Sequence, residues 1–354
     1  MNLRSLIHFA RQHKASDIHV QAGLPPMFRI HGDLVPARGD ALSPEAIESM
    51  LFPALTPDQH ARLERDWHVC LSAVFPDCGR ARVSVYRRNG RWEVAVRLTE
   101  SAIRTREELG LPPIIDDLAR KPSGLVILTG PTGVGKTTTF NYMIDLINAE
   151  RACKIVTLED PIEYVHPYKK ALICQQEHLV DFHDFRSALR HVLRQDPDVI
   201  GVGELRDAET MLTALNAAET GHLVIATLHT HGASDAIQRM VSAFPAGHQD
   251  EVRYMLSGSL QGVISQQLLP RAIDTGRALC CEVLIGTGAV RHQIREGQLH
   301  LLYTEMQAGR KHGMITLDQA LLDLYQRGEI NYDTAISLAR SPDLIRKRAT
   351  TASA

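Results

Sequence analysis

A glycine-rich stretch at residues 130–138 constrains the fold of this chain more than any other feature. It matches the pattern G-x-x-x-x-G-K-[ST] without a mismatch. A short apolar run, 125–129, precedes it, and a segment with the composition of a helix, 138–148, follows. This strand–loop–helix order is the context in which the pattern binds phosphate. We therefore predict a binding loop for a nucleoside triphosphate, formed by Gly130, Pro131, Thr132, Gly133, Val134, Gly135, Lys136, Thr137 and Thr138.

The residue types in this loop suit a phosphate ligand. Glycines let the backbone curl so that successive N–H groups point inward, and the following helix adds the positive end of its dipole. Lys136 is expected to bridge the β- and γ-phosphates of the nucleotide, and the Thr137 hydroxyl to hold Mg²⁺. The alternative is a glycine turn with an unrelated lysine, against which the flanking strand and helix argue.

The bulk composition excludes several classes of protein. A chain of 354 residues with 44% hydrophobic and 23% charged residues is long enough for two globular domains. A net charge of −2 does not favour binding to nucleic acid, which argues against a motor that moves DNA or RNA. No apolar run approaches the roughly 18 residues that span a bilayer, so any membrane association is expected to be peripheral. The six cysteines have neither C-x-x-C nor zinc spacing, as is typical of reduced thiols in a cytoplasmic protein.

The chain divides into segments of different pattern. Residues 1–99 predict a small α+β domain with a helix over 2–13, a Gly32–Asp33 hairpin, helices beginning at Ser43 and Thr56, and an Asn89–Gly90 hairpin. Residues 100–113 predict a linker, 114–286 an α/β core, 287–345 a helical subdomain and 346–354 a disordered tail. Apolar strands separated by helices imply a parallel sheet covered on both faces, and these strands are 125–129, 154–158, 199–202 and 223–227.

Polar residues follow three of these apolar strands. Glu159, Asp160 and Glu163 come after the second strand, Glu204 after the third and His229 after the fourth. Because ligands of open parallel sheets bind outside the carboxyl ends of the strands, we expect these side chains near the terminal phosphate.

The roles of these groups are predicted only in part. Glu204 lies at the Walker B position, but Gly203 stands where an Asp is usual, so Mg²⁺ would be held by Thr137 and, partly through water, by Glu204. Either Glu204 or Glu163 would orient or deprotonate the attacking water. His229 is expected to sense the γ-phosphate or to contact groups across the sheet edge.

Two further groups carry competing interpretations. Glu159 and Asp160 are either site residues or part of a capped turn before Pro161. Hydrolysis at such loops often needs an arginine supplied from outside the site. Strand alternation puts Arg80 and Arg82 on one face, and Arg97 is a third candidate for that face. The alternative for the arginines is a solvated basic face.

Taken together, these segments resemble the secretion-ATPase superfamily, and within it the PilT-type retraction ATPases of type IV pili. The resemblance runs from about residue 3 to 340. The assembly ATPases of the superfamily carry a long N-terminal extension and a four-cysteine metal motif, which this sequence lacks, and this favours retraction. The motifs that carry the resemblance are 15–19 (ASDIH), 23–27 (GLPPM), 130–138, 159–163 (EDPIE, the acidic box), 203–207 (GELRD, Walker B), 219–223 (ETGHL), 227–230 (TLHT, the histidine box) and 289–296 (AVRHQIRE).

This resemblance implies a PAS-like first domain, a RecA-like second domain with a helical C-terminal subdomain, and ATP with Mg²⁺ as ligands. It implies a cytoplasmic homohexamer, peripheral at the inner membrane, that acts on the pilus platform protein there. In the family, arginines of the first domain reach the nucleotide. The resemblance therefore favours a role at the nucleotide for Arg80, Arg82 and Arg97 over a solvated basic face. The acidic-box and Walker B glutamates are catalytic, which matches Glu163 and Glu204.

The retraction motif departs from the family pattern, with Val290, His292 and Gln293 in place of Ile, Asn and Leu. The tail at 316–325 and 331–335 is more similar to PilU, the accessory retraction paralogue. The choice between a primary retraction motor and an accessory one with weak activity of its own therefore stays open, and a paralogous retraction ATPase is a possible partner.

Overall fold

A computed structural model describes residues 2–30, 32–75, 78–98, 103–274 and 276–346. The chain forms two compact units, which we call the N-terminal unit (Met1–Ala102 with Pro161–Val165) and the C-terminal unit (Ile103–Asp160 with His166–Ala354). The predicted tail lies outside the described residues from 347 onward, and so do residues 100–102 of the predicted linker. The rest of that linker contains a short helix, α4, whose capping box joins Thr105 and Glu108.

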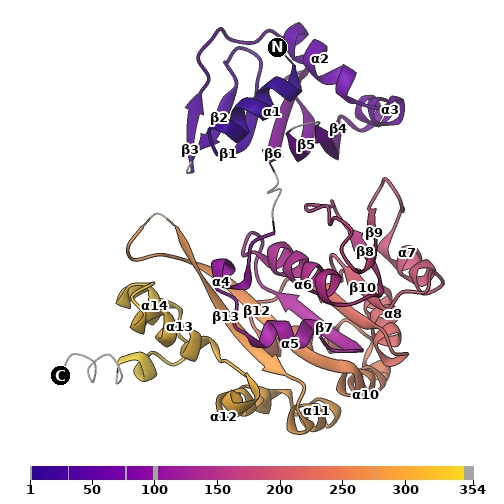
Figure 1. Cartoon of the computed structure of the whole chain (residues 1–354), viewed down its shortest axis with the longest axis vertical. Coiled ribbons are helices and arrows are strands. Elements are labelled where there is room, and N and C mark those ends of the chain that lie inside the picture. The colour runs from indigo at the N-terminus through magenta and orange to yellow at the C-terminus, as the bar shows by residue number, and fades with distance from the viewer. Residues whose placement is uncertain (1, 31, 76–77, 99–102, 275, 347–354) are drawn as a thin grey trace. The chain divides into compact units, whose positions relative to one another are not determined.

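The N-terminal unit is a small α+β domain built on one antiparallel sheet (Figure 1). Its strands lie in the order β3-β2-β1-β6-β5-β4. Ile18, Val83 and Val96 are among the side chains that form its core. The elements are α1 (Leu3–Gln12), β1 (Ala15–Val20), β2 (Met27–Ile30), β3 (Asp33–Pro36), α2 (Pro44–Leu51), η1 (Phe52–Ala54), α3 (Pro57–Asp66), β4 (His68–Phe75), β5 (Gly79–Arg88) and β6 (Arg91–Leu98).

Local sequence explains where these elements begin and end. The Ser43 hydroxyl caps α2, and Thr56 forms a capping box with Gln59 at the start of α3, as the Ser-Pro and Thr-Pro pairs predict. Asn89 and Gly90 both have positive φ, 50° and 76°, which is the backbone of a tight hairpin turn between β5 and β6. The predicted helices and hairpins of this unit are therefore confirmed.

The C-terminal unit is an α/β domain with a seven-stranded sheet in the order β13-β12-β7-β11-β10-β8-β9. Helices cover the sheet, and a helical region, α11 to α14, ends the described chain (Figure 1). The elements are α4 (Arg106–Leu109), α5 (Ile114–Ala119), β7 (Gly124–Thr129), α6 (Lys136–Glu150), β8 (Lys154–Glu159), β9 (Leu172–Glu177), α7 (Phe185–Val192), β10 (Val199–Val202), α8 (Ala208–Glu219), β11 (Leu223–Thr227), α9 (Ala233–Ser242), η2 (Ala246–His248), α10 (Gln249–Ser259), β12 (Leu260–Pro270), β13 (Arg277–Ile285), α11 (Gly288–Arg295), η3 (Leu299–Leu301), α12 (Leu302–Ala308), η4 (Gly309–His312), α13 (Leu317–Gln326) and α14 (Tyr332–Leu338).

The four predicted strands pair in parallel as expected, but the sheet also contains strands that were not predicted, one of them antiparallel. β13 pairs antiparallel with β12, whereas β12, β7, β11, β10, β8 and β9 pair in parallel. The sequence analysis also missed β9, β12 and β13. β9 is an edge strand of mixed polarity and β12 contains polar Ser265 and Gln266, so neither shows the all-apolar pattern of the central strands. The apolar residues 278–281 and 283–285, on either side of Glu282, were a usable signal for β13.

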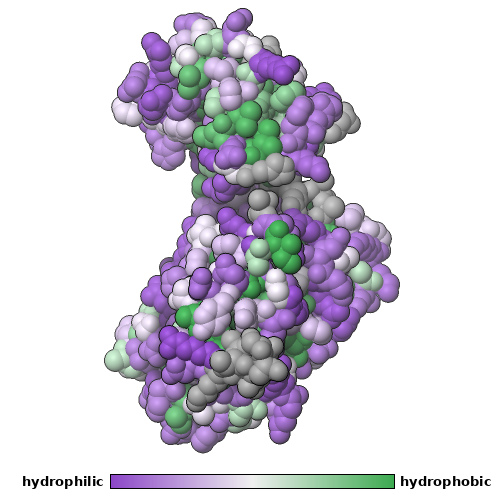
Figure 2. Space-filling view, turned by 90° about the vertical axis from the view of Figure 1, so that its left-hand side faces the viewer, coloured by the Kyte–Doolittle hydropathy of each residue, from purple (hydrophilic) through white to green (hydrophobic). Residues whose placement is uncertain are grey.

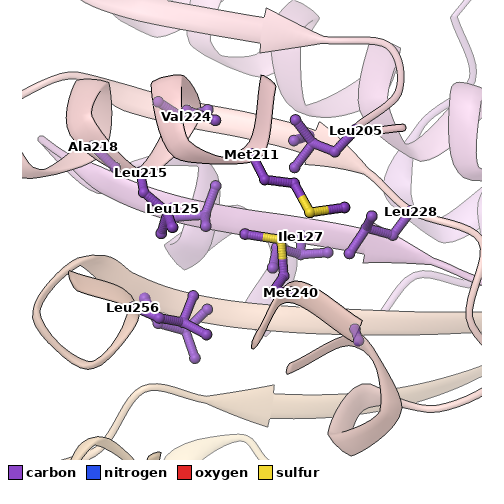
Figure 3. Packing of buried hydrophobic residues seen from close by; sticks show 14 of the residues in the cluster. Leu125, Ile127, Leu205, Met211, Leu215, Ala218, Val224, Leu228, Met240 and Leu256 are labelled. Carbon is purple, nitrogen blue, oxygen red and sulfur yellow. The ribbon is translucent and has the colours of Figure 1, made fainter. Parts of the chain in front are cut away.

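The central strand β7 is buried on both faces. Leu125 and Ile127 face helices α8, α9 and α10, in a cluster with Met211 and Met240 (Figure 3). Val126 and Leu128 alternate to the other face, where their cluster includes Phe140 of α6 and residues of α5. A strand enclosed in this way fixes the position of the loop that follows it.

Among the described residues, no helix is long and apolar enough to cross a membrane. The visible face of each unit is mostly hydrophilic, with small separate apolar areas (Figure 2).

Helix α11 carries the predicted retraction motif and is anchored by Arg291. The guanidinium donates to the carbonyls of Ser257 (2.9 Å), Gly258 and Leu260 (2.7 Å) at the end of α10, and to Gly286 O (2.8 Å). A cation at a helix C-terminus satisfies carbonyls that lack partners within the helix. Gln293, which replaces an apolar residue of the family motif, is buried and donates to Glu305 (3.0 Å).

We expect Arg291→Ala to destabilise the C-terminal unit by about 2 kcal/mol or more, because it leaves several partly buried carbonyls without their charged donor. The matched control is Arg295→Ala on the same helix, since Arg295 is exposed and pairs, among the described residues, with its helix neighbours Glu296 and His292. Chemical unfolding of both variants followed by circular dichroism measures the difference. Equal midpoints would show that the Arg291 contacts do not hold α10 and α11 together.

Candidate nucleotide-binding site

The predicted phosphate loop lies between β7 and α6, directly beside β12. Gly130 has φ 139°, and a Cβ there would lie 2.4 Å from the backbone oxygen of Gln266 in β12. Gly133 and Gly135 also have left-handed φ, 81° and 92°. No other residue type fits Gly130 without moving β12, so the loop's curl depends on glycine. α6 begins at Lys136, where its first backbone N–H groups have no acceptor within the helix.

Lys136 lies folded along this loop and is only 8% exposed. Its Nζ donates to Gly130 O (2.6 Å) and Pro131 O (2.8 Å), and lies 3.4 Å from Nδ1 of His229. Burial lowers the pKa of Lys136, and the negative charge of Glu204 opposes this shift. The cation is thus held at the mouth of the loop, in a partly desolvated setting where it attracts an anion strongly.

His229 connects Lys136 to Glu204. Its Nε2 lies 3.4 Å from Glu204 Oε1, on the side of the ring opposite to Lys136. Burial lowers the pKa of His229, the charge of Lys136 lowers it further, and Glu204 opposes both. A neutral ring with its proton on Nε2 accepts from Lys136 and faces the Glu204 carboxylate with its N–H. The structure therefore brings together three of the predicted site residues.

The strand ends explain this convergence. β7 and β11 pair in parallel with Leu128 opposite Thr227, so both strands end at the same edge of the sheet. Beyond that edge Thr129 Oγ1 accepts from Thr230 N (2.9 Å). This bond fixes the loop that carries His229 against the start of the phosphate loop.

Glu204 leaves β10 at the same edge, and Arg206 holds it. Arg206 Nε donates to Glu204 Oε2 (2.7 Å), while Arg206 also lies 3.4 Å from Asp160. His178 approaches Asp160 to 3.2 Å. Sequence reasoning missed the role of Arg206, although its position two residues after Glu204 at a strand end was a usable signal.

The glycine at position 203 has a steric cause. A Cβ there would lie 2.9 Å from Leu158 O and 3.3 Å from Glu159 Cα, because the backbones of β8 and β10 converge at this point. The aspartate usual at this position would clash with β8 unless the two backbones moved apart.

The three acidic residues of the acidic box, Glu159, Asp160 and Glu163, lie in different environments. Glu159 is 3% exposed and accepts from Thr157 Oγ1 (2.7 Å) and Gln175 Nε2 (2.9 Å) inside the C-terminal unit. Asp160 is exposed beside Arg206 and His178. Glu163 belongs to the N-terminal unit.

Glu163 is partly buried with two of the predicted arginines. Burial raises its pKa, while the charges of Arg82 and Arg97 oppose the rise. On the sheet of the N-terminal unit, Ser72 lies opposite Arg82, Arg82 opposite Arg97, and Arg97 opposite Asp17. This row across β4, β5, β6 and β1 is held by an Arg97–Asp17 ion pair of 2.9 Å.

Arg80 completes the arginine face. It lies two residues before Arg82 on β5, on the face opposite to the buried Ala81 and Val83, and donates to Ser72 Oγ (2.5 Å). The expectation that Arg80, Arg82 and Arg97 share one face is confirmed.

The oxygen donors present fit magnesium. Among the described residues no group of three or more His, Cys, Asp or Glu side chains has the arrangement of a metal site. Mg²⁺ keeps several waters and is commonly held by one or two protein oxygens together with substrate phosphates. The Thr137 hydroxyl in the first turn of α6 and the Glu204 carboxylate at the strand edge supply such oxygens.

A parallel sheet whose central strand runs through this loop into a helix defines a P-loop nucleoside triphosphatase domain. The profile of the type II/IV secretion system protein family matches residues 60–331. This chain belongs to that family, its close homologues are the PilT and PilU retraction ATPases of type IV pili, and it is an ATP-hydrolysing enzyme.

Two full-length relatives and one solved structure illustrate the match. The type IV pilus retraction ATPase PilT of Pseudomonas aeruginosa is 41% identical over 343 residues, which cover 97% of this chain and 99% of that protein. The type IV pilus ATPase PilU of the same organism is 37% identical over 347 residues, covering 98% and 91%. A crystal structure of the pilus retraction motor PilT with bound ADP has a TM-score of 0.92 and 41% identity, covering 98% and 99%. The expected α/β fold, an N-terminal domain followed by a RecA-like ATPase domain, is thereby confirmed.

Opposite effects on the pKa of His229 are expected from two variants. Lys136→Met removes a positive charge and should raise this pKa, whereas Glu204→Gln removes a negative charge and should lower it further. NMR titration of ¹³C-labelled histidine, with the signal assigned through His229→Gln, measures both shifts. Shifts in the same direction would contradict a ring placed between the two charges.

Proposed function

We propose that this chain is an ATP-driven motor that retracts type IV pili. The observation that carries the proposal is the Lys136–His229–Glu204 arrangement at the edge of the sheet beside the phosphate loop. Similarity over almost the whole chain to a type IV pilus retraction ATPase supports the same conclusion.

The C-terminal unit would bind the nucleotide. The loop from Gly130 to Thr138 would surround the phosphates with backbone N–H groups, and Lys136 would neutralise the β- and γ-phosphates. Thr137 and, partly through water, Glu204 would hold Mg²⁺, which neutralises charge that develops during phosphoryl transfer. His229 would link the γ-phosphate to Glu204, because its ring already contacts Lys136 on one side and Glu204 on the other.

Glu163 is our choice for the general base. A base works best when its pKa approaches the operating pH, and burial raises the pKa of Glu163. Glu204, whose carboxylate is paired with Arg206, would orient water and the metal. Arg82 and Arg97, with Arg80, would supply positive charge to the transition state.

The working assembly would be a homohexamer in the cytoplasm, peripheral at the inner membrane. Closed rings are the usual outcome of head-to-tail contacts between identical chains. The ring would act on the inner-membrane platform protein of the pilus and convert hydrolysis into a movement that removes pilin subunits. A paralogous retraction ATPase is a further partner that we propose.

A second candidate function is that of an accessory retraction ATPase with weak activity of its own. Identity of 37% to PilU over 98% of this chain favours keeping it beside the first. The ATPase turnover of the isolated protein separates the two candidates. Stimulation of hydrolysis by single-stranded DNA would instead point to a nucleic-acid motor.

Three single variants test the site. Lys136→Ala should abolish turnover, because the phosphates lose their cation. Glu163→Gln should lower kcat about 100-fold or more while leaving ATP binding intact, as loss of a general base does. Glu204→Gln should weaken the dependence of the rate on Mg²⁺ and lower kcat. Steady-state ATPase assays with Mg²⁺ titration, together with binding of a fluorescent ATP analogue, measure these effects.

Tyr168→Ala serves as the control, since this side chain is 79% exposed. Undiminished turnover in Lys136→Ala would refute the site. If Glu204→Gln loses all hydrolysis and Glu163→Gln loses none, Glu204 is the base instead.

Deletion of the gene should leave cells with more surface pili and without twitching, because assembly continues while retraction stops. Electron microscopy of surface pili and a twitching-zone assay measure the outcome, and expression of the Lys136→Ala chain should fail to complement. Bald cells would instead indicate a role in pilus assembly.

A further inference from the structure

The segment that carries Glu163 has both of its ends held by buried side chains of the C-terminal unit. Glu159 closes β8 before it, and His166 follows it. Glu159 is 3% exposed and the side chain of His166 is fully buried. Residues 160–165 therefore form a short segment between two fixed points, the buried residues Glu159 and His166.

Gln175 of β9 bridges these two fixed points. Its Nε2 donates to Glu159 Oε1 (2.9 Å), and its Oε1 accepts from His166 N (3.0 Å). Thr157 Oγ1 donates to the same Glu159 oxygen (2.7 Å). One amide side chain thus sets the spacing between the start and the end of the segment.

His166 continues the chain of hydrogen bonds to the phosphate-loop helix. Its Nε2 lies 2.8 Å from Asn141 Oδ1, and Asn141 Nδ2 donates to Thr137 O (2.9 Å). Because the amide nitrogen of Asn141 is used as a donor, its oxygen is the acceptor and His166 Nε2 carries the proton. His166 Nδ1 faces Asp145 at 3.8 Å, and Asp145 pairs with Lys169 (2.7 Å).

We propose that His166 is a positioning residue for Glu163. The relay Glu159–Gln175–His166–Asn141 ties both ends of the Glu163 segment to the backbone of Thr137, in the first turn of the helix that follows the phosphate loop. This inference rests on the proposed function, in which Glu163 and Thr137 take part in hydrolysis.

The relay suits a positioning role because Glu159 and His166 are buried and both are hydrogen-bonded to Gln175. Hydrogen bonds between buried side chains restrict the local geometry, and residues that lie behind a reacting group change rates by altering where that group lies. A misplacement of about 1 Å at a reacting group can cost about 100-fold in rate. Loss of the relay should therefore affect the chemical step more than nucleotide binding.

The first test compares two replacements of His166. His166→Phe keeps a planar aromatic ring, although a larger one, but removes the donor, and should lower kcat about 10- to 100-fold with the KM for ATP changed less than 3-fold. His166→Gln places an amide nitrogen near the original Nε2, and should recover most of the lost rate. If the Phe chain does not fold, Gln175→Met cuts the same relay at a partly exposed position and is expected to give the same loss.

The second test asks whether His166 acts through Glu163. In a Glu163→Gln background, His166→Phe should lower kcat no further, because the group that it positions is already gone. Independent, multiplied losses would overturn the proposal.

Asn148→Ala is the matched control. Asn148 is a second buried asparagine of α6, and it anchors the same connection through Pro167 O (2.8 Å) and the N–H groups of Lys169 and Ala171. It lies outside the relay, so its replacement should lower stability and leave kcat within about 2-fold. An equal loss of kcat in Asn148→Ala and His166→Phe would reduce His166 to a structural residue. A wild-type chain that does not hydrolyse ATP would refute the proposed function itself, whereas an active wild type with an unimpaired His166→Phe variant refutes only this inference.

Discussion

Parallel pairing of buried strands is the constraint on which the rest of the C-terminal unit depends. Strands β7, β11, β10 and β8 run in the same direction in continuous register, so all four strands end at the same edge of the sheet. Beside the nucleotide site the backbones approach so closely that a Cβ would clash at Gly130, against β12, and at Gly203, against β8. The phosphate loop and the residues that follow β10 and β11 are placed by this framework, and the loop sequences themselves have little freedom.

Charge is distributed over this framework in a specific way. Lys136 is desolvated and contacts His229, whose pKa is lowered by burial and which in turn faces the Glu204 carboxylate. Within the N-terminal unit Glu163 has the reverse arrangement, a partly buried carboxylate under the influence of Arg82 and Arg97. Each unit therefore holds ionisable groups whose pKa is shifted by burial, which is a common property of functional sites.

The segment that connects β8 and β9 has two structural roles. It carries Glu163 in the N-terminal unit, and its flanking residues Glu159 and His166 are tied together by Gln175 in the C-terminal unit. Through Asn141 the same bonds reach the first turn of α6. A motor needs its chemical step to depend on where its parts lie, and a polar relay with one geometry is a physical means of achieving that dependence.

The sequence by itself determined the phosphate loop, the capped helices, the Asn89–Gly90 turn and the central apolar strands, because each follows from local backbone preferences or from a short periodicity. It also indicated that Glu204 and His229 follow neighbouring strands. Only the tertiary structure decided that Glu159 is a buried hydrogen-bond acceptor while Glu163, four residues later, lies with the arginines. It alone showed the antiparallel edge strand β13, the pairing of Arg206 with Glu204 and the relay through His166. These features depend on strand neighbours and on side chains far apart in the chain, about which local preference carries no information.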